Sequence, residues 1–289
     1  MRWKDWPIKK LDGSFFKKIY KPPKVIYYRG NINPKIFEKS LAIVGSRRMT
    51  RYGKEVIDRF IPELVTNNVT IISGFMYGVD TQAHKKTVEY GGITVAVFGS
   101  GINICYPPEN DKLYTCILEK GGVVLSEYEP DSKPQLWRYP QRNRIVAGLA
   151  SLGVLVIEAG EKSGSLITAE YAQKQGKKIY AVPGPITSSL STGTNLLIKN
   201  GIAKIATEAR DMIGSKNPKL KNSKLPSKPS NLNDKEKKIY TALNLEPLSA
   251  DEIARNLNLD ISEVSTILSL MSLRGILTES VGKFYLGKN

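Results

Sequence analysis

The stretch LAIVGSR, residues 41–47, decides the fold class of this 289-residue chain. It opens with four consecutive apolar residues and ends in Gly45, Ser46 and Arg47. Residues 53–67 follow with apolar side chains at helical spacing. A short apolar strand that passes through a small polar loop into an amphipathic helix is typical of a parallel sheet, because helices cover both faces of such a sheet. The stretch therefore predicts an α/β fold.

The same succession recurs up to residue 213. Further apolar runs predict strands at residues 69–72, 93–98, 123–125, 152–157 and 179–182. Residues 80–90 predict a second helix, between the first two of these runs. We therefore expect residues 41–213 to form a doubly wound parallel sheet with helices on both faces.

Nearly every predicted strand stops at glycine or at a small polar residue. Glycine allows backbone N–H groups to approach an anion, and a serine hydroxyl adds a donor. Ligands of open α/β sheets bind beyond the carboxyl ends of the strands. We expect six such loops to converge on one edge as a phosphate pocket, with contributions from Gly45, Ser46, Arg47, Gly74, Gly99, Ser100 and Gly101.

The stretch RYPQRNRIVAG, residues 138–148, adds positive charge to that edge. Pro140 favours a helix start, because the first turn of a helix needs no N–H donor there. Arg142 and Arg144 then lie near the amino end, where the helix dipole already favours an anion. Residues two apart point to nearly opposite sides of a helix, so both side chains cannot reach one phosphate. For this segment alone, a solvated basic turn is the alternative.

A second anion site is predicted at SGSLITAE, residues 163–170. Ser163 or Ser165 is placed to cap a helix, and the free N–H groups of its first turn would face an anion. An ordinary capped helix without a ligand explains this segment alone equally well.

The titratable residues indicate structural rather than catalytic roles. His84 follows Asp80 by four residues on one predicted helix, which favours a structural contact between them. Glu158 ends a predicted strand, where we expect an ion pair with an arginine of residues 138–148. No Ser–His–Asp spacing stands out, and two cysteines with one histidine make no credible zinc site. We therefore predict neither a catalytic residue nor a metal.

The formal net charge is +16 and the pI is near 9.6, which points to a polyanionic partner. Most of the excess lies outside the predicted sheet. Residues 1–40 carry +8 and residues 214–238 carry +6, whereas residues 41–213 carry +4 and residues 239–289 carry −2. A solubilising arm and a solvated tether are the plain alternative, so binding has to be argued from the pocket.

The regions on either side of the sheet differ in composition. Residues 1–40 interleave aromatic and basic side chains and predict a basic aromatic arm that packs on the core, with one strand over residues 23–30. Residues 214–233, rich in Lys, Pro, Ser and Asn, predict a flexible linker.

Residues 234–289 predict a winged helix. A first helix is followed by a capping box at Ser249, by Asp260 at the start of a third helix, and by a hairpin over residues 276–286. DNA binding is the obvious role for this small domain. Its acidic balance favours a contact with a protein at least as strongly.

The cellular setting predicted from the sequence is the cytoplasm. No run of about 18 apolar residues is present, so we expect no membrane span. The basic start MRWKDWPIKK lacks the apolar region of a secretory signal. Two cysteines do not make a disulfide framework, which fits a reducing compartment.

Six motifs in order carry a resemblance to a known family. They are VGSRRMTRYG (44–53), SGFMYGVDTQAH (73–84), GSGINICYP (99–107), YPQRNRIVAG (139–148), EAGEKSGSLITAEYA (158–172) and VPGPITSSLSTGTNLLIKNG (182–201). Over most of residues 23–213 the chain resembles the DNA-processing protein A (DprA/Smf) family. The resemblance implies an extended Rossmann-like domain that binds single-stranded DNA, forms a homodimer and delivers the strand to RecA in natural transformation or recombination.

The resemblance also implies the nucleic-acid-binding residues. They are Gly45, Ser46, Arg47, Gly74, Gly99, Ser100, Gly101, Arg142, Asn143, Arg144, Ser163, Gly164 and Thr168. Arg47 is the strongest candidate, because it projects from the end of the first strand.

The chain departs from the family pattern in three places. Met76 and Tyr77 replace the small residues usual after the Ser-Gly pair, and Pro108 replaces a basic or polar residue. Residues 1–40 are too short for the helical domain that often precedes the Rossmann-like region, so we expect that domain to be missing.

The function that we predict is a non-enzymatic, cofactor-free recombination mediator that protects incoming single-stranded DNA and loads RecA. NAD and ATP chemistry are disfavoured, because GxGxxG with its acidic partner and the Walker A motif are both absent. One alternative is a nucleotide-binding, phosphoribohydrolase-like enzyme in which Glu170 parallels an acidic residue after a PGGxGT loop, although SGSLITAE replaces that loop. A sensor of a signalling nucleotide is a third possibility.

Overall fold

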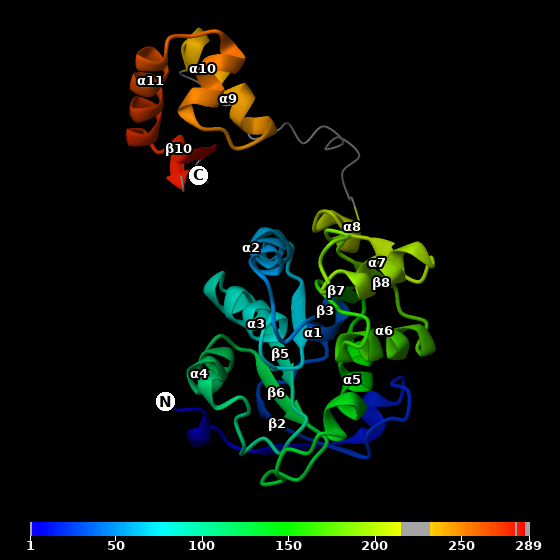
Figure 1. Ribbon diagram of the computed structural model, residues 1–289. Helices are drawn as coiled ribbons and strands as arrows, with labels where there is room; N and C mark the ends of the chain where they lie inside the picture. The colour runs from blue at the N-terminus through cyan, green and yellow to red at the C-terminus, as the bar shows by residue number, and fades with distance from the viewer. Residues whose placement is uncertain (1, 215–231, 281, 287–289) are drawn as a thin grey trace. The chain divides into compact units, whose positions relative to one another are not determined.

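The computed structural model describes residues 2–214, 232–280 and 282–286. The chain forms two compact units, Met1–Ser215 and Lys216–Asn289 (Figure 1). Most of the predicted linker, residues 215–231, lies outside the described residues. In the part of the chain that the structure describes, no helix is both long and apolar enough to cross a membrane.

The first unit is built on one nine-stranded sheet with the order β1-β2-β6-β5-β4-β3-β7-β8-β9. Seven strands pair in parallel, and only β1 and β2 are antiparallel to their neighbours. The strands are β1 (Lys9–Asp12), β2 (Val25–Gly30), β3 (Ser40–Val44), β4 (Thr70–Ser73), β5 (Thr94–Val97), β6 (Val123–Ser126), β7 (Gly153–Val156), β8 (Ile179–Ala181) and β9 (Lys204–Ile205). The predicted strands of residues 41–182 and the predicted parallel α/β fold are thereby confirmed.

Alternation along β3 explains why both faces of the sheet are covered. Leu41 and Ile43 belong to one buried cluster, and Ala42 and Val44 belong to another. Successive side chains of a strand point to opposite faces, so a continuous apolar run needs helices on both sides.

The helices divide between the two faces accordingly (Figure 1). One face is covered by α2 (Arg51–Thr66), α3 (Val79–Glu89), α4 (Asp111–Glu119) and α8 (Arg210–Ile213). The other is covered by α5 (Arg138–Leu149), α6 (Gly164–Lys174) and α7 (Thr192–Lys199). Short helical turns are η1 (Trp3–Asp5), η2 (Gly13–Phe16), α1 (Lys35–Glu38) and η3 (Pro108–Asn110).

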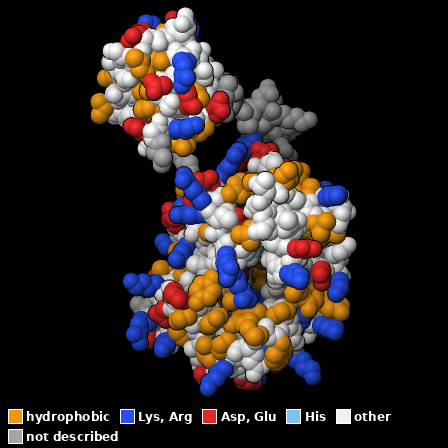
Figure 2. Space-filling view, viewed as in Figure 1, with side chains coloured by type: hydrophobic (Ala, Val, Ile, Leu, Met, Phe, Trp, Pro, Cys, Tyr) orange, Lys and Arg blue, Asp and Glu red, His pale blue; other side chains and the backbone are white. Residues whose placement is uncertain are grey.

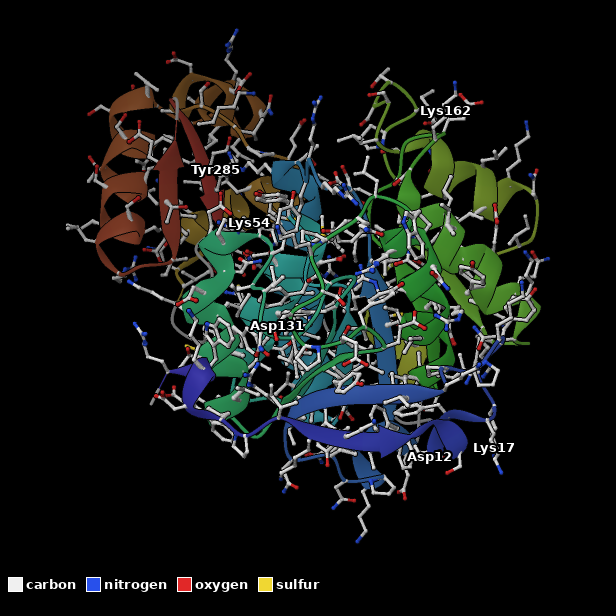
Figure 3. All side chains as sticks on the ribbon, turned by 90° about the horizontal axis from the view of Figure 1, so that it is seen from below. Asp12, Lys17, Lys54, Asp131, Lys162 and Tyr285 are labelled. Carbon is white, nitrogen blue, oxygen red and sulfur yellow. The ribbon has the colours of Figure 1, made fainter. Side chains whose placement is uncertain are left out.

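Residues 1–40 do more than pack on the core as an arm, because β1 and β2 extend the sheet beyond β6. In Figure 3 this segment runs along one edge of the unit, and Asp12 marks the end of β1. Trp3 stacks on Tyr114 with ring centroids 4.6 Å apart. Buried Arg29 donates hydrogen bonds to the carbonyl oxygens of Trp6 and Ile102, both at 2.9 Å. The segment therefore completes the fold of the first unit.

The second unit is a three-helix fold with a hairpin. Its elements are α9 (Asp234–Leu245), α10 (Ala250–Leu257), α11 (Ile261–Leu273), β10 (Leu277–Ser280) and β11 (Lys283–Leu286). The predicted capping box is confirmed, because Ser249 Oγ accepts from the backbone N–H of Glu252 while the Glu252 carboxylate accepts from the N–H of Ser249. Asp260 likewise caps α11 as predicted. This arrangement of helices and wing agrees with the winged-helix prediction.

Candidate nucleic-acid interface

The cavity of the first unit lies where the order of the sheet reverses. From β3 the chain continues through β4, β5 and β6 on one side, and β7 then pairs with β3 on the other side. Adjacent loops separate at such a switch point and leave a crevice at the carboxyl ends of the strands. A cavity of about 480 Å³ lies there, lined by Val44–Arg48, Gly74, Met76, Asp80, Tyr139, Pro140, Arg142, Asn143, Val146, Gly160, Lys162–Ser165, Thr168 and Leu190.

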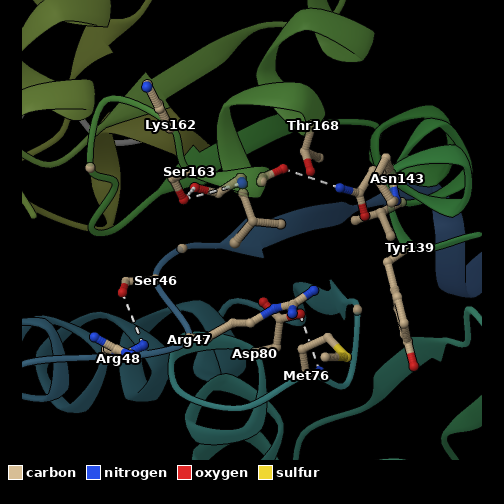
Figure 4. A pocket seen from close by; sticks show the side chains of 18 of the residues that line it. Ser46, Arg47, Arg48, Met76, Asp80, Tyr139, Asn143, Lys162, Ser163 and Thr168 are labelled. Atoms are coloured by element: carbon tan, nitrogen blue, oxygen red, sulfur yellow. Dashed lines mark hydrogen bonds between the residues drawn. The ribbon is translucent and has the colours of Figure 1, made fainter. Parts of the chain in front are cut away.

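Two walls face each other across this cavity. Figure 4 places Lys162, Ser163 and Thr168 on one side and Ser46 and Arg48 on the other. The first wall comes from the loop after β7 and from α6, and the second comes from the loop after β3. Figure 2 shows Lys and Arg side chains beside a hollow in this face of the first unit. The cavity is thus open to a ligand between two polar walls.

Three exposed cations line the cavity, namely Arg47, Arg48 and Lys162. Within the described residues none of them makes an ion pair. Unpaired charge at the mouth of a cleft raises the local concentration of anions. Arg47 was predicted to lie here, whereas Arg48 and Lys162 were not. Their position beside the glycine–serine loops is the sequence signal that could have found them.

The amino end of α6 forms the anion-binding part of the first wall. Ser163, one of the two predicted candidates, is the N-cap, and its hydroxyl accepts from the N–H of Ser165 at 3.4 Å. Asn143 of α5 donates to the carbonyl oxygen of Gly164 at 3.2 Å and so ties the two helices together. The first N–H groups of a helix have no intrahelical acceptor, and the helix dipole favours negative charge at this end. Thr168 lines the cavity one turn further along.

Arg142 lines the cavity, but most of its N–H groups donate to acceptors within the protein. It is buried and donates to the carbonyl oxygens of Gly74, at 2.5 Å, and Val97. Burial lowers the pKa of Arg142 to about 10, so the guanidinium remains charged at neutral pH. Its Nη2 makes no hydrogen bond to any described residue. Arg142 therefore holds the loop after β4 against the end of β5 and adds positive potential at the cavity.

Gly74 is required where this arginine passes the β4 loop. A Cβ at Gly74 would lie 2.5 Å from Arg142 Nη2 and 2.6 Å from Asp80 Oδ2. No real Cβ tolerates such contacts, and the guanidinium is anchored to two carbonyl oxygens. The predicted glycine thus serves the packing of charged groups under the cavity.

Asp80 is the buried acid of the cavity. Its carboxylate accepts from the N–H of Met76 at 3.3 Å. Burial raises the pKa of Asp80, and the positive charge of Arg142 opposes this shift. Met76, which departs from the family pattern, is buried and fills the floor of the cavity beside this carboxylate.

The structure places Arg144 away from the cavity. Its guanidinium forms a double hydrogen bond with the Glu127 carboxylate, at 2.6 and 2.7 Å, and donates to the carbonyl oxygen of Lys21 at 2.8 Å. The physical reason is the predicted one, since residues two apart on α5 point to opposite sides. Arg144 ties α5 to the loop after β6 and to the N-terminal segment.

Gly99, Ser100 and Gly101 do not line this cavity, although the loop after β5 lies at the same edge of the parallel sheet. The β5 strand is two strands away from the switch point at β3 and β7, and its loop packs instead on residues 126–139. Ser100, for example, accepts from the Ser126 hydroxyl at 2.7 Å.

Gly99 nevertheless has a clear role in this packing. A Cβ on Gly99 would lie 2.7 Å from the Tyr139 ring, which lines the cavity. The absence of a side chain therefore lets the Tyr139 ring lie against the end of β5.

Two predicted contacts of titratable groups are wrong. The imidazole of His84 contacts Thr94 rather than Asp80, with Nδ1 and Oγ1 2.7 Å apart. Asp80 is turned instead toward the loop after β4. The Thr94 hydroxyl donates to the carbonyl oxygen of Ile71, so Nδ1 is the donor in its contact with Thr94. Burial lowers the pKa of His84 to about 3.

Glu158 binds a threonine rather than an arginine of the 138–148 segment. Its carboxylate accepts from the backbone N–H of Thr50, at 2.9 Å, and from the Thr50 hydroxyl. The carboxylate thereby holds the start of α2, since Thr50 is the N-cap of that helix. The carboxylate that pairs with an arginine of residues 138–148 is instead Glu127, whose partner is Arg144.

The acid that the enzymatic alternative requires does not line the cavity, and the described residues form no metal site there. Glu170 is exposed on α6 and does not line the cavity. In the described part of the chain, no group of three or more His, Cys, Asp or Glu side chains is arranged to hold a metal ion.

Comparison with known proteins adds to this geometry. Residues 3–217 match the family model described as DNA recombination-mediator protein A, and residues 223–283 match the DprA winged helix domain. The DNA processing protein DprA of Streptococcus pneumoniae is 41% identical over 195 residues, which cover 68% of this chain and 67% of that protein. Protein Smf of Escherichia coli is 40% identical over 191 residues, which cover 66% of this chain and half of that protein.

Two solved structures resemble the first unit. The structure of DNA processing protein A from S. pneumoniae has a TM-score of 0.65 and 37% identity, covering 73% of this chain and 75% of that chain. The structure of DNA processing protein A from Helicobacter pylori, described as giving insight into its single-stranded DNA binding mode, has a TM-score of 0.65 and 30% identity, covering 74% and 96%. The recombination-mediator model matches residues 3–217, well over half of this chain. The chain therefore belongs to the DNA recombination-mediator protein A (DprA/Smf) family.

Proposed function

We propose that the cavity binds the sugar–phosphate backbone of single-stranded DNA and that the chain is a recombination mediator without catalytic activity. The observation that carries the proposal is the set of Arg47, Arg48 and Lys162, which are exposed around a cavity bordered by the amino end of α6 and make no ion pairs among the described residues. Cations together with free helix N–H groups are the chemistry that recognises phosphate. The H. pylori relative, whose structure concerns single-stranded DNA binding, supports the choice of polyanion.

The cavity is better suited to holding phosphates than to cleaving a nucleotide. Asp80 is the carboxylate that lines it, and this buried group accepts from the Met76 N–H. A general acid or base must reach the substrate proton within about 3 Å, directly or through one water. Glu170, the acid that the enzymatic alternative requires, is on the exposed side of α6.

Fluorescence anisotropy tests the proposal with a labelled oligo-dT and a duplex of equal length. We expect tighter binding of the single strand, with an affinity that falls steeply as salt rises. Arg47→Ala should weaken this binding, whereas the control Arg51→Ala should not, because Arg51 lies outside the cavity and pairs with Glu55 at 2.9 Å. Equal and weak binding of both ligands would reduce the +16 charge to a nonspecific effect. Stabilisation by small nucleotides alone would favour the sensor or the enzyme.

The finer functions that we propose are those implied by the family. The mediator would protect incoming DNA, act as a homodimer and load RecA during natural transformation or recombination. Sedimentation velocity tests the homodimer, and a RecA filament-assembly assay on protein-coated single strands tests the loading step. A monomer at all concentrations, or no acceleration of RecA assembly, would contradict the respective proposal.

The second unit is proposed to contact a protein. The α11 hydroxyls of Ser265, Thr266 and Ser269 donate to carbonyl oxygens of their own helix, so they offer few free donors to DNA. Leu270 and Leu273 of the same helix are largely exposed. An exposed apolar pair beside three hydroxyls that already donate within their own helix favours a protein surface over a nucleic-acid groove.

A further inference from the structure

A row of three tyrosine rings starts at the cavity wall and runs outward. Tyr139 of α5 lines the cavity, Tyr106 lies next to it at 6.0 Å between ring centroids, and Tyr77 follows at 6.3 Å from Tyr106. Exposure rises along the row, from 7% for Tyr139 to 36% for Tyr106 and 40% for Tyr77. The rings come from α5, from the loop after β5 and from the loop before α3.

The two outer rings do not contribute to a hydrophobic core. Neither Tyr77 nor Tyr106 belongs to a buried cluster of the described residues. By contrast, Trp3 and Tyr114, which stack on each other in the same unit, are almost fully buried. Large rings that remain half-exposed in a row beside a ligand cavity are available to a flat ligand.

Charge is distributed unequally along the row. At its inner end the Arg47 guanidinium lies over the Tyr139 ring, 5.6 Å from the centroid. At its outer end the Tyr77 hydroxyl donates to Glu109 Oε2 at 3.2 Å, and Glu109 makes no ion pair with any described residue. A phosphate is therefore attracted to the inner end and repelled from the outer end, whereas a neutral base is not repelled.

We propose that Tyr106 and Tyr77 form a stacking shelf for unpaired bases of the strand whose phosphates occupy the cavity. The proposal rests on the function proposed above and names the part of the nucleotide that this surface takes. Base stacking on aromatic rings is tolerant of sequence, because every base has a π face. In a duplex the bases are already stacked and paired, so the shelf adds to the discrimination of single strands from duplexes.

The test compares oligo-dT with an abasic phosphodiester strand of equal length at the same salt concentration. Both carry the same phosphates, but only oligo-dT carries bases. Tyr77→Ala should weaken oligo-dT binding by roughly five- to tenfold and leave abasic binding unchanged. Tyr77→Phe should bind oligo-dT like the wild type, because it keeps the ring and loses only the hydroxyl.

Tyr90→Ala is the matched control. Tyr90 is also a half-exposed tyrosine, but it lies at the far end of α3 and outside the row. It should change neither ligand, and all variants should keep the thermal unfolding temperature of the wild type. Equal effects of Tyr77→Ala on both ligands, or no effect on either, would overturn the shelf while salt-dependent abasic binding upholds the proposed function. If the wild type bound neither ligand, the proposed function and the shelf would both be overturned.

Discussion

The cavity edge of the first unit and the winged helix of the second both carry cations, but the two regions differ in whether acidic side chains pair with them. Within the described residues, Arg47, Arg48 and Lys162 at the cavity have no acidic partner. In the second unit four cations pair with carboxylates, namely Lys235 with Glu263, Arg274 with Glu236, Lys237 with Asp234 and Lys283 with Glu252. What distinguishes a polyanion site is therefore unpaired charge in a cleft, not the number of basic residues.

The hydrogen-bonding groups of the two regions differ in the same sense. At the cavity the amino end of α6, the positive end of its helix dipole, faces a hollow. On α11 the hydroxyls of Ser265, Thr266 and Ser269 bond to carbonyl oxygens of their own helix. A domain family that often binds DNA can thus present a surface whose polar groups are already satisfied.

The largest effect is expected when two of the unpaired cations are removed together. Arg47→Ala with Lys162→Ala should weaken oligo-dT binding about 100-fold or more, because each charge-assisted hydrogen bond to phosphate contributes about 1.5–3 kcal/mol. Arg274→Ala with Lys283→Ala, the matched pair from the second unit, should change affinity less than about twofold. Anisotropy titrations at one salt concentration measure both. A larger loss for the second pair would reverse the comparison.

A fall in pH should destabilise the first unit before the second. The folded pKa of His84 is lowered to about 3, below the ordinary value of 6.5. The stability that neutral His84 contributes is therefore full above pH 6.5 and is lost as the pH falls toward 3, by about 3 kcal/mol at pH 4. In the second unit the pKa values of Glu236 and Glu252 are lowered by hydrogen bonds from the backbone, so its stability falls only below their usual 4.5.

Calorimetry between pH 7 and pH 4 checks this separation. The unfolding transition of the first unit should shift to lower temperature before that of the second. His84→Gln, which keeps a donor to Thr94 but does not titrate, should flatten the pH dependence of the first transition. An unchanged slope in that variant would assign the acid sensitivity to other groups.

Packing under the cavity should be sensitive to a single methyl group. Gly74→Ala places a Cβ against Arg142 and Asp80 and should lower the free energy of unfolding by about 1–3 kcal/mol. Gly164→Ala is the control, because its Cβ would meet no atom within 4 Å at the start of α6. Urea unfolding of both variants measures the difference. Equal stabilities would mean that the Arg142 guanidinium is not held as rigidly as its hydrogen bonds indicate.

The smallest effect is expected at the buried acid. Asp80→Asn keeps an acceptor for the Met76 N–H and removes any negative charge beneath the cavity. Binding of oligo-dT should become about threefold tighter near pH 8, where ionisation of Asp80 is greatest, and the gain should shrink as the pH falls. Weaker binding in the variant would show that the Asp80 carboxylate helps to position the Arg142 side chain rather than repelling the phosphates of the ligand.

Much of the fold could be predicted from the sequence, because the buried strands β3 to β8 are mostly apolar and are followed by glycine or small polar residues. The sequence could not show where the order of the sheet reverses. The loops after β4 and β5 look alike as sequence, yet Gly74 lies at the cavity and Gly99 to Gly101 do not. Helical geometry did predict that Arg142 and Arg144 diverge, but only the fold could assign the cavity to one and Glu127 to the other.

The N-terminal segment and the unpaired cations illustrate a second limit. Residues 23–30 could be predicted as a strand, but the pairing of β2 with β6 depends on a partner about a hundred residues away. Lys162 lies in a loop like many other lysines, and only its position across the cavity from Arg48 identifies it as a candidate contact for a phosphate. Whether a charge is paired is a property of the folded chain.

The slope of log affinity against log salt for oligo-dT tests the central claim most directly. We expect a steep linear fall for the wild type and for Arg274→Ala, and a slope reduced by about 0.7 for Arg47→Ala, since each neutralised phosphate of a single strand contributes about that much. Such a result would locate the phosphate contacts at the cavity. An unchanged slope in Arg47→Ala together with a reduced slope in Arg274→Ala would contradict the account and move the DNA to the winged helix.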